Sequence, residues 1–191
     1  MLKDLLKKNR SYRGYDESRR FTREELAELV EYTRLCPSSA NMQPLKYYLA
    51  WEQDDVNKIQ MMTRWAGAIT DRKLPYDGMC PTAFIVVCQD THISENMTTF
   101  LKDVGIVAQT MLLAAAEKGF GGCMIGSFNK EGVRECLGLA DHLAPHLVVA
   151  LGAPAEVVVL EDAPEGGSVK YYRDEKDVHH VPKRMLSELI L

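Results

Sequence analysis

The chain has 191 residues, of which 46% are hydrophobic and 26% are charged, and its formal net charge is −4. We expect a single globular domain over residues 1–191, because this length and composition suffice for a substantial core. The negative charge gives no electrostatic reason to expect a nucleic acid or an anionic membrane as partner, so any bound anion is expected to be small.

The amino-terminal segment and the cysteines indicate an intracellular protein. Residues 1–8 lack the apolar region of a signal peptide, and no stretch approaches the ~20 apolar residues needed to span a bilayer. The five cysteines form no Cys-x-x-Cys pair, and their odd number argues against a disulfide framework. Clustered thiolates for a zinc site are also missing. We therefore expect a cytoplasmic protein with buried free thiols.

The amino-terminal half is expected to form helices separated by short strands. A short amphipathic helix covers residues 2–8, and the capping-box pattern Thr22-Arg23-Glu24-Glu25 opens a second helix that ends before Pro37. Residues 66–81 mix glycine, proline and charges and are expected to be irregular. The remaining elements are a strand at 47–50, a helix capped by Asp54 or Asp55 that runs through Ile59, Met62 and Trp65, and a strand at 83–88 that is buried on both faces.

The longest expected helix covers residues 100–118 and is almost uninterruptedly apolar. Such a helix is buried, either in the centre of the domain or at a subunit interface, and Gly119 is expected to end it. Strands separated by helices imply a mixed α/β layer fold. The later elements are a helix capped by Asn129, strands at 146–151 and 156–160, and a closing helix at 182–190 with Pro182 in its first turn.

Two polar segments carry the strongest functional signal. Arg10-Ser11-Tyr12-Arg13 places two guanidinium groups around a hydroxyl, and these groups bind phosphate well. Residues 37–44 form a turn rich in hydroxyl and amide side chains, which can read the edge of a flat heterocycle. Lys183-Arg184 would lie at the positive end of the closing helix, a placement that favours a bound anion. Together they predict a phosphorylated cofactor, against the simpler interpretation of a solvated charged surface.

Other patterns favour simpler interpretations. The glycines of residues 119–126 follow a helix, which excludes a dinucleotide-binding fingerprint. A loop with positive φ angles is favoured there, and backbone brought close to a ligand is the alternative. The histidine pairs 142/146 and 179/180 are expected at the surface, so no metal site is predicted. Cys36 has no base nearby in sequence, and no Gly-x-Ser-x-Gly elbow exists, which disfavours thiol-nucleophile and α/β-hydrolase chemistry.

The polar motifs follow one another along the chain in an order that resembles the FMN-dependent nitroreductase family, and the resemblance covers essentially the whole chain. The resemblance implies an α+β nitroreductase-like fold with a central mixed β-sheet flanked by helices, a long buried central helix and a homodimer with FMN at the subunit interface. Because segment 66–81 is short, the chain resembles the compact members of the family. The motifs are Arg10-Ser11-x-Arg13, Pro37-Ser38-Ser39-x-Asn41-x-Gln43-Pro44, the stretch from Asp103-x-Gly105 to Gly126-Ser127-Phe128, and Lys183-Arg184.

The resemblance also implies individual site residues. The FMN phosphate would be held by Arg10, Ser11 and Arg13, with Lys183 and Arg184 closing on it. The partner subunit would supply Ser38, Ser39 and Asn41, with Gln43 nearby. The backbone of Gly126 and Ser127 would approach flavin N5, Met124 would lie against the ring, and Asp103 is a further candidate to face it.

The implied function is NAD(P)H-dependent reduction of nitroaromatic, quinone or related electron-poor small molecules by a ping-pong hydride mechanism. NADH or NADPH would reduce the flavin and leave before the acceptor binds, so no catalytic residue of the protein is assigned. Leu45 stands where the family commonly has tryptophan, and Gly126 replaces an acidic residue of some members, which leaves the acceptor open. The alternatives are another flavin reductase of this fold (an enone reductase or a dehalogenase), a non-enzymatic FMN-binding or redox-sensing protein, or a dimer without cofactor.

Overall fold

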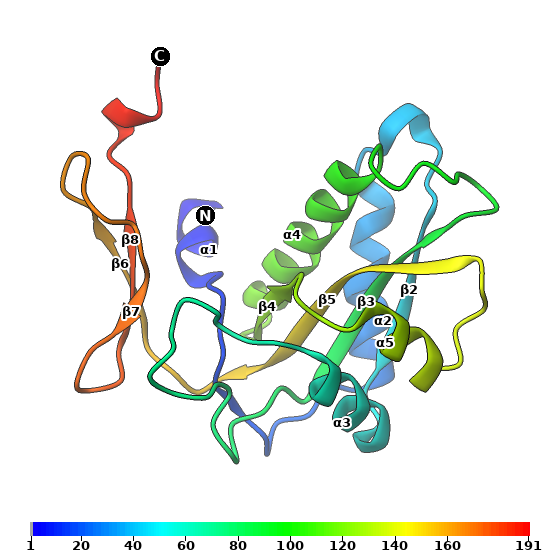
Figure 1. Cartoon of the computed structure of the whole chain (residues 1–191), viewed down its shortest axis with the longest axis horizontal. Coiled ribbons are helices and arrows are strands. Elements are labelled where there is room, and N and C mark those ends of the chain that lie inside the picture. Colours follow the sequence, from blue (N-terminus) through cyan, green and yellow to red (C-terminus); the bar gives the residue numbers. More distant parts are fainter. Residues whose placement is uncertain (1) are drawn as a thin grey trace.

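The centre of the protein is a five-stranded antiparallel sheet, seen in a computed structural model that describes residues 2–191 (Figure 1). Strands β3 and β4 pair with opposite edges of β5, β1 pairs with the carboxyl-terminal end of β5, and β2 closes the sheet beyond β3. The bounds are Tyr15–Asp16 for β1, Leu45–Ala50 for β2, Ala83–Asp90 for β3, Gly121–Ile125 for β4 and Leu143–Pro154 for β5.

The α+β fold class is confirmed, but the expected mixed pairing of the central sheet is wrong. Strands β3 and β4 run in the same direction and are joined by a helix, as in a parallel crossover unit. β5 is inserted between them, so each hydrogen-bonded strand pair in this sheet is antiparallel. Parallel pairing occurs instead in a small second sheet, between Val158–Asp162 (β6) and His179–Lys183 (β8).

Helices cover both faces of the central sheet. The helices are Leu2–Lys8 (α1), Arg23–Glu31 (α2), Gln53–Met62 (α3), Leu101–Glu117 (α4) and Lys130–Cys136 (α5). On one face, α2 and α4 pack against Ile85 and Val87, and on the other α3 and α5 pack against Phe84 and Val86. Alternate residues of β3 therefore enter two separate cores, which confirms the expected strand buried on both faces.

Local capping signals explain why several helices begin where the sequence predicts. The Thr22 hydroxyl accepts a hydrogen bond from Glu25 N, and the Glu25 carboxylate accepts one from Thr22 N, which completes the capping box. Asn129 caps α5 through a bond from Gly132 N to its side-chain oxygen. Residues 66–81 contain no helix or strand, as expected. Within the described residues, the structure shows no helix with the length and apolarity needed to cross a membrane.

Two details of α3 differ from the prediction. Its N-cap residue is Glu52, whose side chain makes no capping bond, rather than Asp54 or Asp55. The helix ends at Met62, before Trp65, because Thr63 adopts extended backbone angles and pairs with Phe128 in an isolated antiparallel bridge.

The glycine-rich segment 119–126 is mostly strand, so the favoured loop interpretation holds only at its start. Gly119 has φ of +80° and follows the end of α4, as expected. Gly121 and Gly122 lie in β4, and the need for glycine there is steric. A Cβ at Gly122 would lie 2.3 Å from the Ala150 carbonyl oxygen and 2.6 Å from Leu112 Cδ2. These glycines let neighbouring chain segments approach closely.

The expected closing helix at 182–190 is wrong. Residues 179–183 form β8, which pairs in parallel with β6 and antiparallel with Tyr172–Arg173 (β7), and only a 3₁₀ turn at Leu186–Glu188 follows. Pro182 lies opposite Glu161 in this ladder; its fixed φ suits an extended strand as well as a helix start. This small sheet stands beside α1, away from the main sheet (Figure 1). The helix-dipole argument for an anion at Lys183-Arg184 therefore fails.

Candidate cofactor-binding site

A cavity of about 380 Å³ lies between the segment after α1, the middle of α4, β4 and the small sheet. Five of the twelve residues predicted from the sequence line it: Arg10, Ser11, Arg13, Met124 and Lys183. The other lining residues are Asn9, Gln109, Leu112, Val158, Tyr171, His179 and Val181. The structure thus brings the predicted phosphate-binding segment together with β8, which lies about 170 residues further along the chain.

Close packing against β4 positions the arginine segment at this cavity. Tyr12 N donates to Gly122 O over 3.0 Å, and Ser11 pairs with Gly122 in a parallel bridge. The Tyr12 ring lies against Gly121, where a Cβ would meet a ring carbon at 2.5 Å. Because both glycines lack a side chain, the backbone of residues 11–12 can lie directly along β4.

The buried Glu156 carboxylate holds the backbone of Arg13 rather than its guanidinium. Glu156 accepts a hydrogen bond from Arg13 N and forms an ion pair with Arg173. Its charge is therefore already balanced by a different arginine, whose side chain is also buried. Within residues 2–191, no ion pair involves Arg10, Arg13 or Lys183. Three positive charges thus line the cavity without a carboxylate partner.

His179 is the buried histidine of this cavity, with 1% of its surface exposed. Its Nδ1 lies 3.5 Å from Arg13 Nη1, and its ring meets Tyr171 edge-on at 5.4 Å between centroids. Burial, together with the nearby charges of Arg13 and Arg173, lowers the pKa of His179 to about 4. The imidazole is therefore neutral at pH 7.

The contact with Arg13 fixes which histidine nitrogen carries the proton. A guanidinium can only donate, so Nδ1 must accept and the neutral ring is protonated at Nε2. Nε2 is buried, as is Arg10 Nε, and neither has a hydrogen-bond partner among residues 2–191. Buried donors are normally satisfied. A bound anionic group would accept hydrogen bonds from these two donors and balance the positive charges of Arg10, Arg13 and Lys183.

A second, smaller cavity of about 160 Å³ lies near the N-terminal end of α4, and Ser38 and Gln43 line it together with Asp103. Asp103 is buried, and it accepts bonds from Ser38 Oγ at 2.7 Å, Ser39 N at 2.9 Å and Ser39 Oγ at 2.9 Å. Burial alone would raise the pKa of this carboxyl, but the three bonds together hold the pKa below its ordinary value. In this chain Asp103 anchors the 38–43 loop.

The anchored loop has an unusual backbone. Ala40, Asn41 and Gln43 have φ angles of 51°, 53° and 51°, in the left-handed region that residues with a Cβ adopt rarely. Gln43 Nε2 donates to Asn41 Oδ1 at 3.0 Å and to the backbone carbonyl oxygen of Asn41 at 3.1 Å, and these two bonds stabilise the turn. Strained backbone that the surroundings hold in place is typical of ligand-binding loops.

The remaining predicted residues lie outside both cavities. Ser127 lines a separate cavity of about 480 Å³ together with Arg64, whose N donates to Ser127 O at 2.9 Å. Gly126 is exposed, and a Cβ there would meet no atom within 4 Å. Arg184 bonds to Glu188 at 3.3 Å. The predicted set is therefore divided between separate parts of a single chain.

The cavity lined by Arg10, Arg13 and Lys183 is called the main cavity below. Four of its polar or aromatic residues were not predicted from the sequence, namely Asn9, Gln109, Tyr171 and His179. A signal for His179 was present. His179, Val181 and Lys183 alternate along β8 and all line the cavity, as period-two spacing in a strand requires. Reading this segment as a helix start concealed the alternation.

Comparison with known proteins identifies the family. The model of the nitroreductase family matches residues 6–153, more than three quarters of the chain. The chain belongs to the nitroreductase family. Two archaeal relatives are each named as a candidate NADH dehydrogenase/NAD(P)H nitroreductase. The protein of Methanothermobacter thermautotrophicus is 27% identical over 158 residues, or 80% of this chain and 77% of the relative. That of Archaeoglobus fulgidus is 29% identical over 154 residues, or 77% and 82%.

Solved structures agree with this assignment. A nitroreductase family protein from Clostridium difficile 630 is 26% identical with a TM-score of 0.64, covering 81% of this chain and 84% of its own. A candidate nitroreductase from Exiguobacterium sibiricum, solved in complex with FMN, has a TM-score of 0.68 at 19% identity, covering 82% and 89%. The latter shows the shared fold. The nitroreductase family is a family of oxidoreductases, and the curated relatives are named as candidate NAD(P)H nitroreductases.

Proposed function

We propose that this nitroreductase binds FMN and uses NADH or NADPH to reduce nitroaromatic, quinone or related electron-poor acceptors by a ping-pong mechanism. The observation that carries the proposal is the main cavity, where Arg10, Arg13 and Lys183 have no carboxylate partner and His179 Nε2 has no acceptor among the residues that the structure describes. Its volume of about 380 Å³ lies within the usual range of small-molecule sites. The FMN-bound relative and the NAD(P)H nitroreductase names support the same cofactors.

The residues present fit a phosphorylated flavin. Arg10, Ser11, Arg13 and Lys183 would hold the phosphate, and His179 would donate an additional hydrogen bond from Nε2. Because His179 is neutral, it adds a donor without adding repulsion between itself and Arg13. Met124 would pack its thioether against the ring system. When bound, FMN supplies the hydride chemistry, and the protein supplies binding, orientation and charge.

We infer that the complete site is shared between two copies of the chain, as a homodimer. The 38–43 loop lines a cavity separate from the arginine cluster, so the two parts of the predicted site would meet only if a second chain supplies one of them. The exposed apolar residues Leu101 and Ile106 of α4, and Leu189 and Ile190 at the carboxyl terminus, are suited to such an interface. In that assembly the partner would present Ser38, Ser39, Asn41 and Gln43.

The backbone of Gly126 and Ser127, and Arg184, remain proposed contacts with the flavin. Gly126 follows Met124 by two residues, at the end of the strand that borders the cavity. We place the protein in the cytoplasm, where its free cysteines would stay reduced.

The redox-sensing alternative has weaker support from the cysteines. Burial raises the pKa of Cys88 to about 12 and also raises the pKa of Cys123, so neither thiol forms a reactive thiolate at neutral pH. Enone reduction and dehalogenation remain alternatives within the same cofactor chemistry.

The visible spectrum of purified protein tests the proposal. We expect flavin absorption bands, bleaching by NADH or NADPH without oxygen, and recovery of the bands on adding a nitroaromatic or quinone. Bound flavin that never bleaches would indicate a non-enzymatic FMN binder. A protein that neither contains nor takes up FMN contradicts the proposal. Parallel assays with enones and halophenols compare the acceptor classes.

A further inference from the structure

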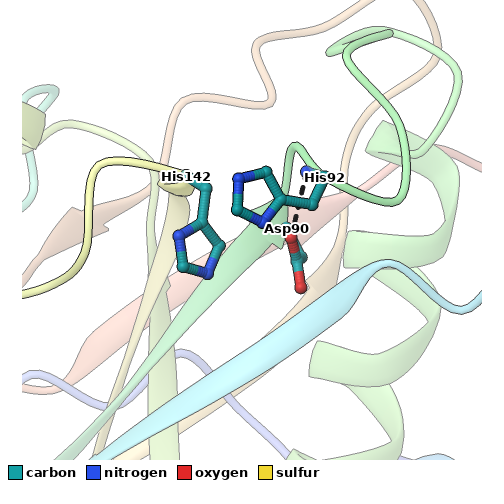
Figure 2. A group of neighbouring side chains, drawn as sticks. All are labelled: Asp90, His92 and His142. Carbon is teal, nitrogen blue, oxygen red and sulfur yellow. Dashed lines mark hydrogen bonds between the residues drawn. The ribbon is translucent and has the colours of Figure 1, made fainter.

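A separate cluster of three metal-ligating side chains lies at one end of the central sheet. Asp90 is the last residue of β3, His92 lies in the following turn, and His142 immediately precedes β5. One ligand atom from each residue lies within 4.8 Å of the other two. Figure 2 shows the two imidazole rings side by side with the Asp90 carboxylate next to His92. None of the three residues lines the cofactor cavity or the cavity at the 38–43 loop.

The sequence predicts no metal site at either histidine pair, and His146, four residues after His142, lies 3.2 Å from the Gln89 side chain. His142 is brought to His92 by strand pairing, because Asp90 lies opposite Leu143 in the β3–β5 ladder. The two rings stack, with centroids 4.2 Å apart and planes 9° apart. The cluster is thus a product of the fold that the sequence spacing does not reveal.

Backbone hydrogen bonds hold all three residues in place. Thr91 donates to His142 O from its N at 2.8 Å and from its hydroxyl at 3.0 Å. Asp90 N donates to Pro44 O at 2.8 Å, and Asp90 O accepts from Ile93 N at 3.1 Å. The Asp90 carboxylate accepts from His92 N at 3.0 Å. A metal ion therefore needs to order only side-chain rotations, which keeps the entropic cost of binding low.

The imidazole nitrogens are free to coordinate. Among residues 2–191, neither ring of the pair makes a hydrogen bond through its nitrogens, and Asp90 Oδ2 also has none. In a tetrahedral zinc site the ligand bonds of ~2.0–2.2 Å place ligand atoms ~3.3 Å apart. The ligand atoms now lie within 4.8 Å of one another, so binding would require the exposed His92 ring to rotate out of its stack on His142.

We propose that Asp90, His92 and His142 form a binding site for a divalent transition-metal ion of the Zn²⁺ class. Two imidazoles and one carboxylate favour zinc, cobalt, nickel or copper over calcium and magnesium, which prefer all-oxygen sites. Three protein ligands leave at least one position to water. The ion would join the end of β3 to the segment before β5, next to Pro44 at the end of the 37–44 turn.

Calorimetric titration of Zn²⁺ into the flavin-loaded, untagged protein tests this site, with Co²⁺ absorption as a second readout of coordination. We expect one ion per chain with a dissociation constant below ~100 µM. His92→Asn and His142→Asn should each weaken binding at least ~10-fold, because removing even an outer partner of a metal site costs that much. Glu95→Gln, an exposed carboxylate in the same loop, should bind as the wild type does.

Two results would overturn the proposal. One is wild-type protein that binds neither Zn²⁺ nor Co²⁺ in this range. The other is unchanged affinity in both histidine variants, which would place the bound ion elsewhere. His92 is exposed, so its variant should fold normally and keep the test valid if His142→Asn is unstable. The flavin spectrum, recorded in the same samples, reports on the cofactor site independently.

Discussion

The neutral state of buried His179 predicts a specific loss of stability in mild acid. Burial and the nearby arginines lower the pKa of its folded state to about 4, while an unfolded chain has an ordinary value near 6.5. The unfolded state therefore binds the proton more readily, and the free energy of unfolding falls as the pH drops from about 6.5 toward 4. Between pH 7 and pH 5 this single group accounts for at most ~2 kcal/mol.

Chemical denaturation of the wild type and of His179→Gln at both pH values measures this contribution. Other groups titrate in both proteins, so the difference between them isolates His179. We expect the wild type to lose ~1–2 kcal/mol more than the variant between pH 7 and pH 5. The reasoning is refuted if both proteins lose the same amount, or if NMR titration gives His179 a pKa at or above its ordinary value.

The neighbouring His180 provides a control of opposite sign. Hydrogen bonds to Glu161 and Asp174 raise the pKa of this partly exposed histidine. Its contribution to stability is present below its ordinary pKa and is lost as the pH rises through the raised value. His180→Gln should therefore lack the stability that the protonated His180 gives the wild type at acidic pH. His179→Gln retains His180 and should keep that stability.

Three further predictions follow from the packing of the structure. Gly122→Ala should lower the free energy of unfolding by ~1–3 kcal/mol in denaturant, because the added Cβ would lie 2.3 Å from Ala150 O. The control Gly126→Ala should change it by less than ~0.5 kcal/mol, because a Cβ there would meet no atom within 4 Å. Asp103→Ala should leave three donors of Ser38 and Ser39 without their acceptor, which should cost ~1–3 kcal/mol and increase hydrogen exchange in the 38–43 loop; unchanged exchange would contradict the anchoring role. Cys88, whose thiol pKa is raised to about 12, should resist alkylation in the folded protein, and rapid labelling under native conditions would show that the strand is open.

Local signals made much of the fold predictable from sequence. The capping box at Thr22 and the apolar run of α4 depend on neighbouring residues only, and both were found. The β8 segment was misread because Pro182 suits a helix start as well as an extended strand, and the choice was made by distant pairing with β6. Gly122 was included in a predicted loop because the sequence does not reveal that the Ala150 backbone lies against it.

The candidate site was predictable to the extent that its residues are adjacent in sequence. Arg10, Ser11 and Arg13 form a compact motif, and the structure places them in one cavity. His179 could not be connected to them, because the contact with Arg13 spans 166 positions of sequence. The role of Asp103 as an anchor for Ser38 and Ser39 likewise depends on a tertiary contact.

The central claim is that the unpaired positive charges of the main cavity bind the FMN phosphate. Equilibrium titration of FMN, followed by quenching of its fluorescence, tests it most directly in the wild type, Arg13→Gln and a matched control, Lys118→Gln, whose lysine pairs with Glu28 away from the cavity. We expect the wild type and the control to bind FMN equally, and Arg13→Gln to bind at least ~10-fold more weakly, because a charge-assisted contact with phosphate contributes ~1.5–3 kcal/mol. Equal affinity in all three proteins, or no binding by the wild type, would contradict the account.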